Sequence, residues 1–138
     1  MRKLLFVIAA ITFLASSCSK NDSQDRKKMM LGTWTLIELG EDLNTNGNLD
    51  NGETQPASSY GVSGYYTFNE DGTAVSSVTI GTGSQTSNVN WSLTNNDQNL
   101  YVSSGSQSVT FPIKELTKNR LVLLNTDSSP GTWNVYSK

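Results

Sequence analysis

Short stretches in which apolar and polar residues alternate follow one another along most of the chain. The clearest lies at residues 86–93, where Ser87, Val89, Trp91 and Leu93 share one face of a strand and polar residues occupy the other. Comparable runs cover residues 34–39, 65–68, 73–80, 99–103, 109–116, 121–124 and 132–136. Turns rich in Gly, Asn or Ser separate them, and beyond the N-terminal segment the only sign of helix is a turn at residues 25–30. The pattern predicts eight short strands.

Connection lengths decide how such strands are arranged. All but the first connection have hairpin length, which is typical of an antiparallel meander, and eight strands are enough to close a small barrel. We therefore predict an all-β fold, an eight-stranded antiparallel up-and-down barrel over residues 30–138, with a β-sandwich as the alternative.

A different pattern begins the chain. Arg2 and Lys3 precede an apolar run at residues 4–15, and small residues follow it. A basic start, a short apolar run and a small-residue boundary are typical of a secretory signal peptide, which we place at residues 1–17. The run is shorter than the roughly 20 apolar residues that span a bilayer.

The boundary carries the only cysteine of the chain, Cys18, which therefore has no partner for an internal disulfide. Residues 14–18, Leu-Ala-Ser-Ser-Cys, resemble the lipobox of bacterial lipoproteins, in which the cysteine is diacylated. The resemblance implies a lipid-anchored envelope protein. The residue after Cys18 is Ser19, not the aspartate that usually retains lipoproteins in the inner membrane, so we expect the outer membrane, on its periplasmic or its outer side. The alternative is a buried or unrelated thiol.

Residues 18–29 follow this boundary and are polar, with little to bury. We predict a flexible tether there.

The first long connection, residues 42–53, has the spacing of an EF-hand calcium loop. Oxygen-bearing residues stand at positions 1, 3, 5, 7, 9 and 12, with Gly47 at position 6 and Leu49 at position 8. The predicted ligands are Asp42, Asn44, Asn46, Asn48 through its backbone carbonyl, Asp50 and Glu53. Only three of them are carboxylates, so we expect a structural calcium ion bound weakly, at roughly 0.1–1 mM.

An ordinary polar loop is the alternative for the same residues. The chain contains 14 asparagines, so Asn-Gly turns arise readily, and strand and turn sequences rather than helices flank this loop.

Charge and composition exclude several classes of function. The chain has no histidine, so it lacks an imidazole base, and the acidic pair at residues 70–71 lies in a turn. We predict that it is not an enzyme. Loss of Arg2 and Lys3 with the signal peptide would change the net charge from −2 to −4, and the short basic run at residues 26–28 does not indicate nucleic acid binding.

Several segments resemble bacterial lipocalin-like lipoproteins. Residues 31–34, Leu-Gly-Thr-Trp, look like the Gly-x-Trp signature of lipocalins, and residues 66–73, 89–93, 113–117 and 121–124 extend the likeness. The resemblance implies that Gly32 and Trp34 form a plug at the closed end of the barrel. It also implies a basic side chain over the indole, for which the sequence offers Arg120, with Lys118 behind it.

Two functions fit these observations. The first is a lipoprotein that binds a small apolar or amphipathic molecule in the barrel mouth. The second is a structural or protein-interaction lipoprotein whose barrel is filled, because a barrel of this size is either packed or holds one small ligand. For either we expect a monomer.

Overall fold

The computed structural model describes residues 20–138, with side chains from Gln24 onward. The predicted signal peptide and Cys18 lie outside the described residues. Within residues 20–138, no helix combines the length and the apolar character needed to cross a membrane.

Strands make up most of the described chain. An N-terminal helix, α1 (Lys20–Met30), is followed by β1 (Gly32–Glu41), β2 (Thr54–Pro56), a 3₁₀ helix η1 (Ala57–Tyr60), β3 (Val62–Phe68), β4 (Thr73–Ile80), β5 (Gly83–Thr94), β6 (Asn99–Ser104), β7 (Gln107–Leu116), β8 (Arg120–Asn125) and β9 (Thr132–Ser137). Each of the eight predicted runs lies within one of these strands. The short β2 was not predicted.

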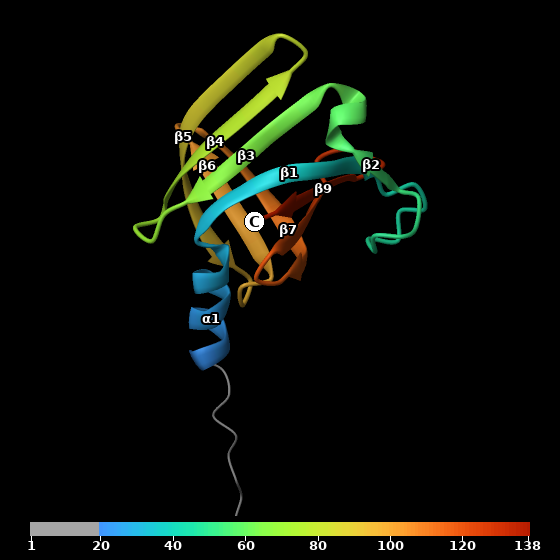
Figure 1. Cartoon of the computed structure of the whole chain (residues 1–138). Coiled ribbons are helices and arrows are strands. Elements are labelled where there is room, and N and C mark those ends of the chain that lie inside the picture. The colour runs from blue at the N-terminus through green and yellow to red at the C-terminus, as the bar shows by residue number, and fades with distance from the viewer. Residues whose placement is uncertain (1–19) are drawn as a thin grey trace, which may run out of the picture.

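The strands close into a barrel (Figure 1). From β3 to β9 each strand pairs antiparallel with the next, and β1 completes the ring by pairing with β3 on one side and β9 on the other. The three-residue β2 pairs only with β1, beyond the end of its pairing with β3. The predicted eight-stranded barrel is confirmed, and the β-sandwich alternative is wrong.

Inward-facing side chains form the core. Trp34, Phe68, Trp91, Leu100 and Tyr136 belong to one cluster, which also contains Met30 at the end of α1. Phe68 stacks on Tyr66, with ring centroids 5.3 Å apart, and meets the Trp91 ring edge-on at 5.1 Å. The predicted alternation along residues 86–93 is confirmed, because Val89 and Trp91 are buried.

A second, smaller cluster lies on the outer face of the barrel. It comprises Val122, Leu124, Trp133 and Val135, with Leu49 of the 42–53 loop packed against it. These strand residues alternate with inward-facing ones, so they would be exposed without a cover. The loop therefore gives this part of β8 and β9 a buried outer face.

The predicted tether at residues 18–29 is wrong over its described part, because residues 20–30 form α1. The polar sequence was a reason to expect little burial. The helix contains no Gly or Pro, however, and carries Lys27 and Lys28 in its last turn, where basic side chains stabilise a helix C-terminus. Two contacts fix the helix against the closed end of the barrel: Met30 is fully buried, and Arg26 Nε donates to the carbonyl of Asp97 at 3.1 Å.

Candidate functional site

The closed end of the barrel is plugged by Trp34. Its side chain is fully buried, and its indole Nε1 donates to the carbonyl of Met30 at 2.8 Å. The plug thus ties the last turn of α1 to the floor of the barrel, as the Gly-x-Trp resemblance implied for this residue.

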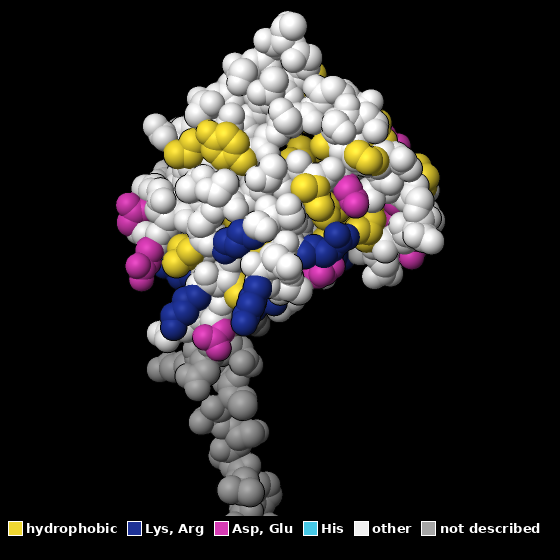
Figure 2. Space-filling model, in the orientation of Figure 1, with side chains coloured by type: hydrophobic (Ala, Val, Ile, Leu, Met, Phe, Trp, Pro, Cys, Tyr) yellow, Lys and Arg dark blue, Asp and Glu magenta, His cyan; other side chains and the backbone are white. Residues whose placement is uncertain are grey.

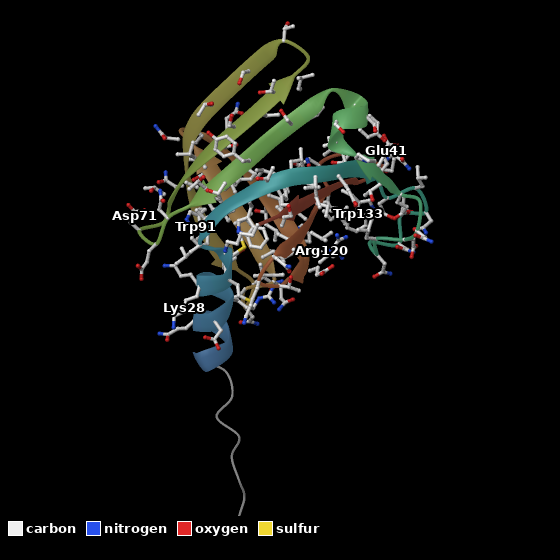
Figure 3. The ribbon with its side chains drawn as sticks, in the orientation of Figure 1. Lys28, Glu41, Asp71, Trp91, Arg120 and Trp133 are labelled. Atoms are coloured by element: carbon white, nitrogen blue, oxygen red, sulfur yellow. The ribbon has the colours of Figure 1, made fainter. Side chains whose placement is uncertain are left out.

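The basic partner of the indole is Lys138, and the prediction of Arg120 is wrong. Lys138 Nζ lies 4.6 Å from the Trp34 ring centroid and donates to the carbonyl of Met29 at 2.9 Å. Burial lowers the pKa of Lys138. Arg120 precedes the inward-facing Leu121, so it points outward, where its Nε pairs with Glu115 Oε2 at 3.1 Å (Figure 3).

Gly32 allows the backbone to pass close to Lys138 in a conformation that other residues rarely adopt. Its φ is +101°, and a Cβ there would lie 3.1 Å from the Lys138 side chain. The glycine of the signature therefore leaves room for the lysine that covers the tryptophan.

The opposite end of the barrel carries a pocket of about 500 Å³. The ends of β1 and β9, the 42–53 loop and η1 contribute its walls. Leu39 and Asn134 pair with each other and continue the inward-facing rows that contain Leu36 and Tyr136. Its apolar lining comes mainly from Leu39, Leu43 and Tyr60, and the latter two are 67% and 55% exposed. The volume lies in the range of small-molecule sites.

All the charged side chains that line this pocket are acidic. Glu41 and Glu53 line it, and none of its lining residues is Lys or Arg. The sequence explains this, since no Lys or Arg occurs between residues 29 and 113. Figure 2 shows the dark-blue basic side chains of this face gathered over its half nearest α1. In Figure 3, Glu41 and Trp133 lie together at the end that carries the 42–53 loop.

The 42–53 loop curls around its own polar side chains. Asp42 accepts from the backbone N–H groups of Asn46 and Gly47, at 3.2 and 2.9 Å. Asp50 Oδ2 accepts from the side-chain amides of Asn44 and Asn46, both at 2.8 Å, and these bonds lower the pKa of Asp50. Gly47 has φ +68°, the left-handed turn expected at position 6.

Glu53 links this loop to the barrel wall. Its carboxylate accepts from the backbone N–H groups of Leu43 and Asp50, and Oε2 also accepts from the indole Nε1 of Trp133 at 3.1 Å. Asp42 and Glu53 are 4% and 8% exposed, and the sole ion pair among the described residues is the one between Arg120 and Glu115. Among the described residues, the carboxylates of Asp42 and Glu53 are therefore buried without an ion pair to a basic side chain.

The donor set of the loop depends on amide oxygens. Among residues 20–138, no three His, Cys, Asp or Glu side chains gather closely enough to hold a metal ion by themselves. The oxygens of Asn44 and Asn46 accept from backbone N–H groups two residues ahead. To bind calcium, these side chains would have to turn their oxygens toward the centre of the loop.

A family model for the lipocalin-like domain matches residues 30–123. The chain belongs to the lipocalin-like family. A lipocalin-like protein from Bacteroides uniformis has a similar structure, with a TM-score of 0.52 and 16% sequence identity over 80% of this chain and 98% of that one. No curated protein matches the sequence.

Two structures of bovine odorant-binding protein are also similar to this lipocalin-like chain. A deswapped triple mutant gives a TM-score of 0.45 at 18% identity, over 80% of this chain and 74% of that one. A complex with a selenium-containing odorant gives 0.46 at 14% identity, over 81% and 74%.

Sequence reasoning found the plug of this lipocalin-like barrel and missed most of the pocket. The position of Lys138 over the plug could have been inferred, because Lys138 lies two residues after the inward-facing Tyr136 and so continues the same row of the strand. The place of Tyr60 in the pocket wall could not have been inferred, since Tyr60 belongs to a 3₁₀ helix without a periodic pattern.

Proposed function

We propose that this protein is a non-catalytic lipoprotein of the bacterial envelope that binds a small apolar or amphipathic molecule at the open end of its barrel. The pocket between the ends of β1 and β9, η1 and the 42–53 loop is the observation that carries this proposal. An eight-stranded barrel is either packed with side chains or wide enough to hold one small ligand. The core side chains around Trp34 pack closely, which favours binding near the rim.

Calorimetric titration of the purified protein with neutral, anionic and cationic amphiphiles tests the proposal. Saturable binding that is weakened by Leu39→Asn, in the pocket wall, and unchanged by Thr110→Asn, at an exposed position of β7, is the expected result. The alternative function, a structural or interaction protein with a filled barrel, is favoured by the same close packing of the core. It predicts no binding of any amphiphile.

The membrane attachment we propose is diacylation of Cys18. It is supported by the signal-like segment before it and by the absence of a second cysteine. The wild-type protein should partition into the detergent phase of a two-phase extraction, and Cys18→Ala should move it to the aqueous phase. A wild-type protein found in the aqueous phase would contradict the anchor.

We also propose that the 42–53 loop binds one structural calcium ion. The spacing of its oxygen-bearing residues and the left-handed turn at Gly47 support this, because both match the positions that an EF-hand calcium loop requires. At a dissociation constant of about 0.1 mM, about 2 mM calcium would add about 1.8 kcal/mol to the free energy of unfolding.

Thermal unfolding in calcium and in chelator measures that increment. Asp42→Asn should abolish it, whereas Asp71→Asn, in the exposed turn between β3 and β4, should retain it. Equal melting temperatures of the wild-type protein in both buffers would refute the calcium site and leave the amphiphile proposal standing.

A further inference from the structure

The pocket at the open end has the chemistry of a site for a cation rather than for a fatty acid. Its carboxylates belong to Glu41 and Glu53, and no basic side chain lines it. An anionic ligand head would meet repulsion there without a compensating partner, whereas a cationic head would be attracted. This electrostatic asymmetry is built into the sequence, because the long central segment has no Lys or Arg.

Tyr60 adds a second, independent contribution. Its ring lies on the wall of the pocket and is 55% exposed. The face of an aromatic ring attracts ammonium groups, and an aromatic ring together with a carboxylate is a common way to recognise quaternary ammonium. Glu41 is the more available carboxylate, since Glu53 is 8% exposed and already accepts from Trp133 and two backbone N–H groups.

Leu39 and Leu43 supply an apolar surface next to these polar groups. A ligand that fits the whole lining therefore has an apolar body and a positively charged head. We infer that the rim pocket selects amphipathic cations, with Glu41 and Tyr60 contacting the head and the two leucines contacting the apolar body. This inference depends on the amphiphile binding proposed above and specifies the class of ligand.

Three probes with the same alkyl chain test the selectivity: decyltrimethylammonium, decanol and decanoate, each titrated calorimetrically below its micellar concentration in the presence of chelator. We expect decyltrimethylammonium to bind about tenfold or more tightly than decanoate, with decanol between them, as two nearby carboxylates would produce. Tryptophan emission should change on binding, because the buried Trp133 lines the pocket.

Two pairs of variants separate specific recognition from general attraction to an acidic protein. Glu41→Gln should weaken binding of decyltrimethylammonium about threefold to fivefold, whereas Glu70→Gln, which changes the net charge equally in a distant turn, should leave it unchanged. Tyr60→Ala should weaken it about fivefold, and Tyr60→Phe should retain it because the ring face remains.

Decanoate binding as tightly as the cation, or equal effects of Glu41→Gln and Glu70→Gln, would overturn the inference while leaving amphiphile binding intact. Failure of all three probes to bind would overturn both this inference and the proposed function.

Discussion

Trp34 is the residue whose replacement tests the plugged barrel most directly. Its side chain is fully buried beneath Lys138, and its Nε1 holds the carbonyl of Met30. Burying roughly 200 Å² of indole at about 25 cal/mol per Å² corresponds to about 5 kcal/mol. An alanine keeps a small part of that burial, so Trp34→Ala should lower the free energy of unfolding by about 3–5 kcal/mol. Total stabilities of single domains are about 5–15 kcal/mol, so the loss would be severe.

Trp34→Phe divides this effect into its parts. The phenyl ring retains much of the apolar contact but cannot donate to Met30, whose carbonyl loses its indole partner. Loss of that hydrogen bond should cost about 0.5–1.5 kcal/mol, in addition to the smaller volume of the ring. We expect Trp34→Phe to lie clearly between the wild-type protein and Trp34→Ala.

Urea unfolding followed by far-ultraviolet circular dichroism is the suitable assay, because removal of a tryptophan changes the fluorescence signal itself. A constant dependence of the unfolding free energy on urea would show that the variants unfold from equally compact states. Hydrogen exchange should also become faster in α1, since the helix loses its contact with the plug. A Trp34→Ala protein within about 0.5 kcal/mol of the wild type would refute the plug and the role of Trp34 in the core.

Three further outcomes follow from the described contacts. Lys138→Gln should lower the unfolding free energy by about 0.5–1 kcal/mol through loss of its contact with the indole, and Arg120→Gln by less than about 0.5 kcal/mol; the reverse order in urea unfolding would contradict the assignment. Hydrogen bonds from the Asn44 and Asn46 amides should hold the pKa of Asp50 below its ordinary value of 3.8 in carboxyl NMR titrations. Its stabilising contribution is then complete above pH 3.8 and lost as the pH falls through the folded-state pKa, so a midpoint at or above 3.8 would be inconsistent with the observed hydrogen bonds. Trp133→Phe removes the indole donor to the buried carboxylate of Glu53 and should cost about 1.5–3 kcal/mol in the same unfolding assay, whereas unchanged stability would show that this bond contributes nothing.

The strands could be predicted because burial imposes a period of two on them. In β5, Val89 and Trp91 face the core while their neighbours face solvent, and the sequence shows that alternation directly. The three residues of β2 are too few to show any period, and one of them is Pro56. Pairing with β1 after a long loop, rather than local preference, makes them a strand.

The helix and the plug partner were missed for different physical reasons. Low hydrophobicity predicted that residues 18–29 would bury little, but it says nothing about helix propensity, and contacts of Arg26 and Met30 with distant residues fix α1 in place. Arg120 was chosen for its side-chain chemistry. Its neighbour Leu121 faces inward, which already implied an outward orientation for the arginine.

The rim pocket could not be predicted because its walls come from segments distant in sequence. Leu43 lies in the polar 42–53 loop and Tyr60 in the 3₁₀ helix η1, and the two share no hydrophobic periodicity. Asn134 comes close to them only because β9 closes the barrel against β1. The sequence also shows the lack of basic residues in the central segment, but that lack does not by itself place a pocket.

The base of the 42–53 loop has a consequence for how this barrel can be altered. The backbone N–H of Glu41 donates to the carbonyl of Glu53 at 3.1 Å, so the two ends of the loop are held together independently of its contents. A segment closed in this way can be exchanged for another with little change to the barrel, because the entropy of closing a loop varies slowly with its length. Two positions limit the exchange: Glu53 accepts a hydrogen bond from the Trp133 indole, and Leu49 covers the outer cluster around Trp133. A transplanted loop that carries an aliphatic residue in place of Leu49 would keep this cluster covered, whereas a short glycine-rich replacement would uncover an apolar patch and favour self-association.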